Sequence, residues 1–203
     1  MKTPTFTIIA SGLDPEAEGY EDRLFEAGCD DATFSFQKGV IIAEFHREAA
    51  TFSAAIASAY EAMLSAGAKV ERIEPDHLVS LSEIAERSGL TRQAISLYTR
   101  AERGENFPGP VAKVTSKHPL WDWPEVAEWL FERGTLSRED VVEARIVKEA
   151  NCHLEGVNHI AHDGSKAPRC VQLYVEGLGC EELIHTLDPK RLDRLQVYST
   201  LIS

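Results

Sequence analysis

The chain has 203 residues, which is enough for two small domains. Hydrophobic residues make up 43% of it and charged residues 27%, the composition of an ordinary globular protein. No apolar run approaches the roughly 20 residues that a membrane-spanning helix needs, and we expect no export signal. The four cysteines are scattered, which indicates reduced thiols and not a disulfide framework. We therefore expect a cytoplasmic protein.

Residues 1–76 alternate between β-rich runs and apolar residues at helical spacing. The expected strands and helices follow one another at 5–10 (strand), 20–27 (helix), 32–36 and 40–45 (strands), 52–64 (helix) and 69–73 (strand). Gly39 lies in the short turn between the second and third strands, where glycine adopts positive φ without strain. The order βαββαβ predicts a ferredoxin-like α/β domain that dimerises, binds a small ligand or docks a partner.

Charge is unevenly distributed along the chain. The net charge is −12, and residues 1–77 hold 14 acidic and 6 basic side chains. We expect the acidic runs at 14–16 and 30–31 to be solvated turns. An acidic surface of this kind either attracts a basic partner or discourages nonspecific contact with DNA. Residues 87–117 are the exception, because they hold six basic side chains against two acidic ones.

Residues 78–134 begin with a strong helix signal. Ser80 and Glu83 have the spacing of a capping box, in which each side chain accepts a hydrogen bond from the other residue's backbone N–H. The helix that follows buries Ile84 and the small Ala85 and ends at Gly89. Ala85 lets two helices cross closely, and Gly89 allows a tight turn. The pattern predicts a helix-turn-helix.

A second short helix and a wing are expected after the turn. Thr91 caps this helix, and its inward face includes Ile95 and Tyr98. The Tyr98 ring belongs either to the core between the helices or to a contact of its hydroxyl with a nucleic-acid backbone. A strand at 111–115 and a return at 120–121 are expected to form a two-stranded wing.

Three stretches of this region resemble the MerR-like and excisionase-like winged helix-turn-helix family. They are SLSEIAERSGLTRQAISLYTR (80–100), FPGPV (107–111) and WDWPEVAEWL (121–130). The resemblance covers about 55 residues, roughly a quarter of the chain, and it implies a winged helix-turn-helix domain that binds DNA. In MerR-like proteins the DNA-binding domain usually comes first, whereas here it follows residues 1–76. The metal or drug sensing of that family therefore does not carry over.

The second helix carries side chains suited to reading base edges, because a recognition helix places its first two turns in the major groove. Arg92 offers two donors to guanine and Gln93 pairs with adenine, each pairing contributing roughly 1–3 kcal/mol of discrimination. Basic residues farther along the chain suit phosphates or a minor groove. The candidate DNA-binding residues are Thr91, Arg92, Gln93, Ser96, Thr99, Arg100, Arg103, Lys113 and Lys117.

The sequence thus predicts a sequence-specific regulator of transcription that binds double-stranded DNA. One small domain with few cations binds weakly, so we expect a homodimer or a higher homo-oligomer. An antitoxin-like protein that regulates its own toxin or defence operon is a close variant. The alternatives are a protein-interaction adaptor whose winged helix domain does not bind DNA, and an excisionase-like architectural factor. No motif of nucleotide binding or nucleophilic catalysis occurs, and we expect no enzyme, no catalytic residue and no cofactor.

Residues 135–203 are expected to form a helical C-terminal region that packs on the wing domain or on a second subunit. Val141, Val142 and Ile146 recur in the manner of an amphipathic helix. A metal site is a weaker alternative for the polar residues beyond them, which lack any CxxC or HExxH spacing, and we expect none. Those residues are Cys152, His153, His159, His162, Cys170, Cys180 and His185.

Overall fold

The structure, a computed structural model, describes residues 3–163 and the side chains of its last helix as far as Glu155. It is a mixed α+β fold, and the described residues divide into two compact units, one of residues 3–72 and 151–163 and one of residues 73–150. Expectations for residues 164–203, including Cys170, Cys180 and His185, lie outside the described residues. Among the described helices, none is both long and apolar enough to cross a membrane.

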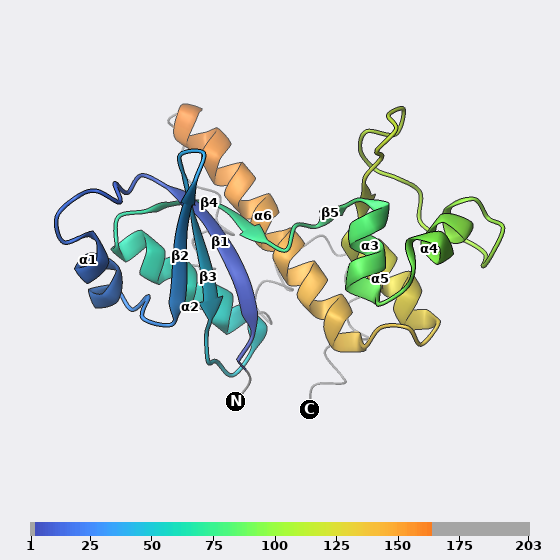
Figure 1. The fold of residues 1–203 in the computed structure, drawn as a ribbon, viewed down its shortest axis with the longest axis horizontal. Coiled ribbons are helices and arrows are strands. Elements are labelled where there is room, and N and C mark those ends of the chain that lie inside the picture. The colour runs from blue at the N-terminus through green and yellow to red at the C-terminus, as the bar shows by residue number, and fades with distance from the viewer. Residues whose placement is uncertain (1–2, 164–203) are drawn as a thin grey trace. The chain divides into compact units, whose positions relative to one another are not determined.

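The first unit contains a four-stranded sheet, two helices of its own and residues 151–163 of α6 (Figure 1). Its elements in chain order are β1 (Thr5–Ser11), α1 (Tyr20–Glu26), β2 (Ala32–Gln37), β3 (Val40–His46), α2 (Phe52–Ser65) and β4 (Lys69–Glu74). The strands lie in the order β2-β3-β1-β4, and β3 runs antiparallel to both of its neighbours. This is the order of elements that the sequence predicts, with each boundary within two residues of its expected place.

One face of this sheet is the core of the first unit. Alternate residues of β1 are buried opposite alternate residues of β3, in the pairs Phe6–Phe45, Ile8–Ala43 and Ala10–Ile41. The Phe52 ring of α2 meets Phe6 edge to face, and the Tyr20 ring of α1 meets Phe36 in the same way. Both helices therefore cover the face on which these alternate residues lie.

Helix α1 buries fewer apolar residues than its sequence predicts. Tyr20 and Leu24 are buried, whereas Phe25 is 68% exposed. Residues five positions apart on a helix point about 140° away from each other, so Phe25 cannot share the buried face of Tyr20. Phe25 therefore does not contribute to the core of the first unit.

An ion pair fastens the turn before β2 to the segment after β3. The Arg47 guanidinium donates to both carboxylate oxygens of Asp31, from Nε at 2.8 Å and from Nη2 at 2.6 Å, and Nη2 also donates to the Gly28 carbonyl oxygen. The Arg47 hydrogen bond holds the pKa of Asp31 below its usual value. The expectation of a solvated turn at 30–31 is wrong for Asp31, because its carboxylate is paired with Arg47. The sequence carries no local signal of this pairing, since the two residues are 16 positions apart.

The second unit consists of short strands and helices around one hydrophobic core. Its elements are β5 (Leu78–Val79), α3 (Leu81–Ser88), α4 (Arg92–Thr99), β6 (Trp121–Asp122), α5 (Trp123–Glu132) and the first part of α6 (Arg138–Asp163), of which residues 138–150 belong to this unit. Strands β5 and β6 pair antiparallel. The buried core residues are Val79, Ile84, Ala85, Ile95, Trp121, Trp123, Val126, Ala127, Trp129, Leu130, Val141 and Ala144.

Helix α6 contributes a narrow apolar stripe. Val141, Ala144 and Val147 are buried at a spacing of three residues, while Val142 and Ile146 are only partly buried. The expected amphipathic helix therefore forms, with Ala144 and Val147 on its buried face and Val142 and Ile146 at the margin of that face. Small residues at these positions allow the helix to lie close to its neighbours.

Replacing Arg47 tests the ion pair. In Arg47→Met the Asp31 carboxylate and the Gly28 carbonyl lose their donor, and we expect the free energy of unfolding at about pH 7 to fall by about 2 kcal/mol. Because the pKa of Asp31 is lowered in the folded state, the pair stabilises the protein above the usual carboxyl pKa, and this contribution is lost as the pH falls through the lowered value. Urea unfolding at about pH 7 and about pH 2 measures both effects.

The matched control is Arg23→Met on the exposed surface of α1, which we expect to change stability by less than about 0.5 kcal/mol. Equal effects of the two substitutions, or a cost for Arg47→Met that is as large at acid pH as at about pH 7, would contradict the role of the pair.

Candidate nucleic-acid interface

Helix α3 begins and ends as its sequence predicts. The Ser80 hydroxyl accepts a hydrogen bond from the Glu83 backbone N–H at 3.4 Å, and the Glu83 carboxylate accepts one from the Ser80 backbone N–H at 2.7 Å. The capping box is therefore confirmed. Gly89 ends the helix with φ of 68°, a conformation that strains residues with a Cβ.

Helix α4 follows after three residues, 89–91, and presents its first turn to solvent. Thr91 caps it by accepting a hydrogen bond from the Ala94 backbone N–H at 3.1 Å, which confirms the predicted start. Ile95 is fully buried and anchors the helix in the core. Arg92 and Gln93 precede Ile95 by three and two residues, and both are exposed.

Several candidate DNA-binding residues lie on the outer face of α4. Gln93, Ser96 and Arg100 recur at intervals of three or four residues, which places them along one side. Ser96 is partly buried, and Arg100 is exposed just after the end of the helix. Thr99 is also partly buried, and its hydroxyl donates to the Ser96 carbonyl oxygen at 3.0 Å. Thr99 is therefore less available to a ligand than its neighbours.

Aromatic rings hold the C-terminal end of α4. The Tyr98 ring lies edge to face with Trp129 of α5 at a centroid distance of 4.9 Å and stacks on Phe107 at 6.1 Å. Tyr98 therefore takes the core position, one of its two expected roles. The Arg103 guanidinium lies over its outer side, 5.4 Å from the ring centroid.

Two indole N–H groups fasten the loop that follows α4. Trp129 Nε1 donates to the Glu105 carbonyl oxygen at 3.0 Å, and Trp121 Nε1 donates to the Pro108 carbonyl oxygen at 3.1 Å. Arg133 adds a third bond, from Nη2 to the same Glu105 oxygen at 2.8 Å. The sequence pattern does not predict these bonds. The available signal was that a buried indole N–H needs an acceptor.

The wing is smaller than expected. Residues 111–115 form no strand, and their only ladder contact is a bridge between Ala112 and Leu120, with hydrogen bonds in both directions. Lys113 has φ of 49° and its carbonyl accepts from the Ser116 backbone N–H, so the chain turns immediately after the bridge. Trp121 pairs with Val79 of β5 instead of extending the wing.

Five of the six basic residues at 87–117 are exposed. Arg100, Arg103, Lys113 and Lys117 are exposed, as is Arg92. Arg87, which the count also includes, is largely withdrawn from the surface. Its Nη1 donates to the Asp76 carbonyl oxygen at 2.7 Å, its guanidinium lies 5.4 Å from the Trp123 ring centroid, and burial lowers its pKa.

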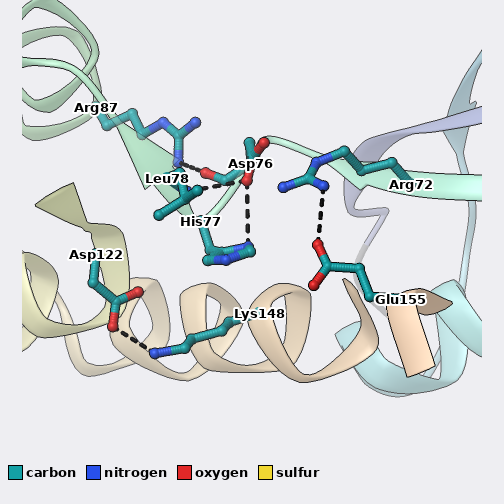
Figure 2. A network of polar contacts seen from close by, with 8 residues as sticks. All are labelled: Arg72, Asp76, His77, Leu78, Arg87, Asp122, Lys148 and Glu155. Carbon is teal, nitrogen blue, oxygen red and sulfur yellow. Dashed lines mark hydrogen bonds and ion pairs between the residues drawn. The ribbon is translucent and has the colours of Figure 1, made fainter. Parts of the chain in front are cut away.

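An ion pair joins α6 to the start of α5. Lys148 Nζ donates to Asp122 Oδ2 at 2.5 Å, and the Asp122 side chain is only 5% exposed. Figure 2 shows the two side chains pointing toward each other from β6 and α6. Among the described residues, no three or more His, Cys, Asp or Glu side chains are grouped so that they could hold a metal ion.

Replacing Gly104 tests whether the fastened loop supports α4. Gly104 has φ of +73°, and a Cβ there would lie 3.1 Å from Trp129 Cζ2 and 3.2 Å from Tyr98 Cδ1. We expect Gly104→Ala to lower the free energy of unfolding by about 1–3 kcal/mol, measured by urea unfolding. Gly109→Ala is the matched control, because a Cβ there meets no atom within 4 Å. Equal stability of the two variants would show that the close packing of Gly104 against Trp129 and Tyr98 does not stabilise the fold.

Comparison with known proteins identifies no relative of this chain. No protein-family model matches it. No curated protein and no solved structure matches it either. The residues and their geometry are therefore the basis for assigning a function.

Proposed function

We propose that residues 73–150 bind double-stranded DNA in a sequence-specific manner and that the protein regulates transcription. One observation carries the proposal. The first turn of α4 presents Arg92 and Gln93 to solvent, and within the described residues neither side chain has a hydrogen bond or an ion pair. Two side chains that read base edges are thus available on a helix that is fixed at both ends.

We infer that α3, the turn at Gly89 and α4 correspond to a helix-turn-helix, and that the bridge between Ala112 and Leu120 corresponds to a much reduced wing. The crossing of two capped helices on a shared core supports this interpretation. The strand order β2-β3-β1-β4 with both helices on one face supports a ferredoxin-like arrangement for the first unit.

In this proposal the first turn of α4 recognises the bases. A guanidinium such as that of Arg92 donates two hydrogen bonds to O6 and N7 of guanine, and an amide such as that of Gln93 pairs with N6 and N7 of adenine. Thr91 contributes less, because its hydroxyl already caps the helix. Each matched pairing supplies roughly 1–3 kcal/mol of discrimination between bases.

The basic side chains outside this turn contact the phosphates of the DNA backbone. Arg100 follows α4 directly, Arg103 is held against Tyr98, and Lys113 and Lys117 lie on the loop that carries the bridge. These positions suit backbone contacts, which fix the register of the protein on DNA but do not read its sequence. Few cations imply modest affinity, so two copies on half-sites about 34 Å apart are needed for tight binding.

Fluorescence anisotropy across a salt series tests the proposal, with DNA from upstream of the protein's own gene and a scrambled duplex. We expect a preference of several hundredfold for the upstream DNA, weakening as salt rises. Arg92→Ala and Gln93→Ala each remove about 1–3 kcal/mol of discrimination, a loss of about 5- to 150-fold on the preferred duplex. Lys113→Ala with Lys117→Ala weakens binding to both duplexes and makes the salt dependence shallower.

Arg23→Ala, on exposed α1 in the first unit, removes the same charge as Arg92→Ala and is the matched control. It is expected to leave the preference unchanged. Equal binding of both duplexes, or no binding at about 100 mM salt, would refute the proposal and favour the protein-interaction adaptor.

A further inference from the structure

Among the described residues, strand β2 forms an open edge of the sheet in the first unit (Figure 1). Its one neighbour in that part of the chain is β3, and its sequence ATFSFQ contains no charged residue, no proline and no glycine. The opposite edge, β4, has the sequence KVERIE, in which four of six residues are charged. Natural sheets protect their edges with charges, prolines or bulges, because unpaired edges bind other strands. Only β4 has such protection.

The hairpin shows which backbone groups of β2 point outward. Gln37 pairs with Val40 across a two-residue loop, and both loop residues, Lys38 and Gly39, have positive φ, as in a type I′ turn. Odd-numbered residues of β2 therefore bond to β3, in agreement with the bond from the His46 backbone N–H to the Asp31 carbonyl at 3.0 Å. The N–H and C=O groups of residues 32, 34 and 36 face away from the sheet.

We propose that β2 pairs antiparallel with β2 of a second copy of this chain, around a two-fold axis perpendicular to the sheet. Such an axis keeps the helices of both copies on the same side, so an even-numbered residue must lie opposite an even-numbered one. Centring the pair on Ser35 places Phe34 of one copy opposite Phe36 of the other. Phe34 and Phe36 then exchange their outward N–H and C=O groups.

Side chains favour this register. Phe36 is 39% exposed, and Phe34 of the partner copy covers it in an aromatic cross-strand pair. Ser35 lies opposite Ser35 of the partner copy, where two small hydroxyls fit without conflict. The hairpin loop with Lys38 then lies near the turn with Asp30 of the partner copy, and both residues are exposed and of opposite charge. The symmetry repeats each contact, so the interface contains two such charge pairs.

The Ser35 position supplies a direct test. In Ser35→Lys two ammonium groups face each other across the axis, and in Ser35→Glu two carboxylates do so, whereas an equal mixture of the two variants pairs opposite charges. The full chain is studied by sedimentation over a concentration series. We expect the wild type to be a dimer, each variant to have a dissociation constant roughly tenfold or more weaker, and the mixture to regain dimers. Circular dichroism checks that each variant is folded.

Ser65→Lys, at the exposed C-terminal end of α2, adds the same charge away from β2 and is expected to leave the dimer unchanged. Hydrogen exchange supplies a second measurement. The Phe34 and Phe36 amides should exchange slowly in the wild-type dimer and faster in Ser35→Lys. A monomeric wild type would overturn the proposal, as would a dimer that Ser35→Lys leaves intact. These readouts do not involve DNA, so they stand or fall separately from the proposed function.

Discussion

The second unit depends on a simple constraint, which is that a buried indole N–H must find an acceptor. Trp121 and Trp129 meet it with the carbonyls of Pro108 and Glu105, both in the loop that follows α4. The same bonds bring Phe107 and Tyr98 against Trp129, so the end of α4 is fixed by its neighbours in space. A helix of eight residues has little stability alone, and this packing explains how so short a helix holds a defined outer face.

Much of the local structure could be predicted because its signals lie within a few residues of one another. The capping box of Ser80 and Glu83, the Thr91 cap and the turn at Gly39 each involve groups at most three residues apart. Even there, position within a turn mattered, as exposed Phe25 shows.

Contacts between distant residues could not be predicted. Arg47 bonds to Asp31, Arg87 to the Asp76 carbonyl and Lys148 to Asp122, across 16, 11 and 26 residues. Nothing in the spacing of these residues marks them as partners, since a charged residue on a helix is more often solvated. The candidate interface is affected directly. Counting cations assigned Arg87 to the basic surface, whereas the fold places it against Trp123.

The pairing of Asp122 with Lys148 has a consequence for how this sequence can vary. Asp122 occupies the N-cap position of α5 but makes no capping bond, and its Oδ1 has no hydrogen-bond partner among the described residues. Loss of the ammonium alone would leave a carboxylate buried without compensation, whereas replacing both residues with apolar ones of similar volume is often neutral. Positions 122 and 148 are therefore expected to vary together in evolution, as a polar pair or as an apolar one.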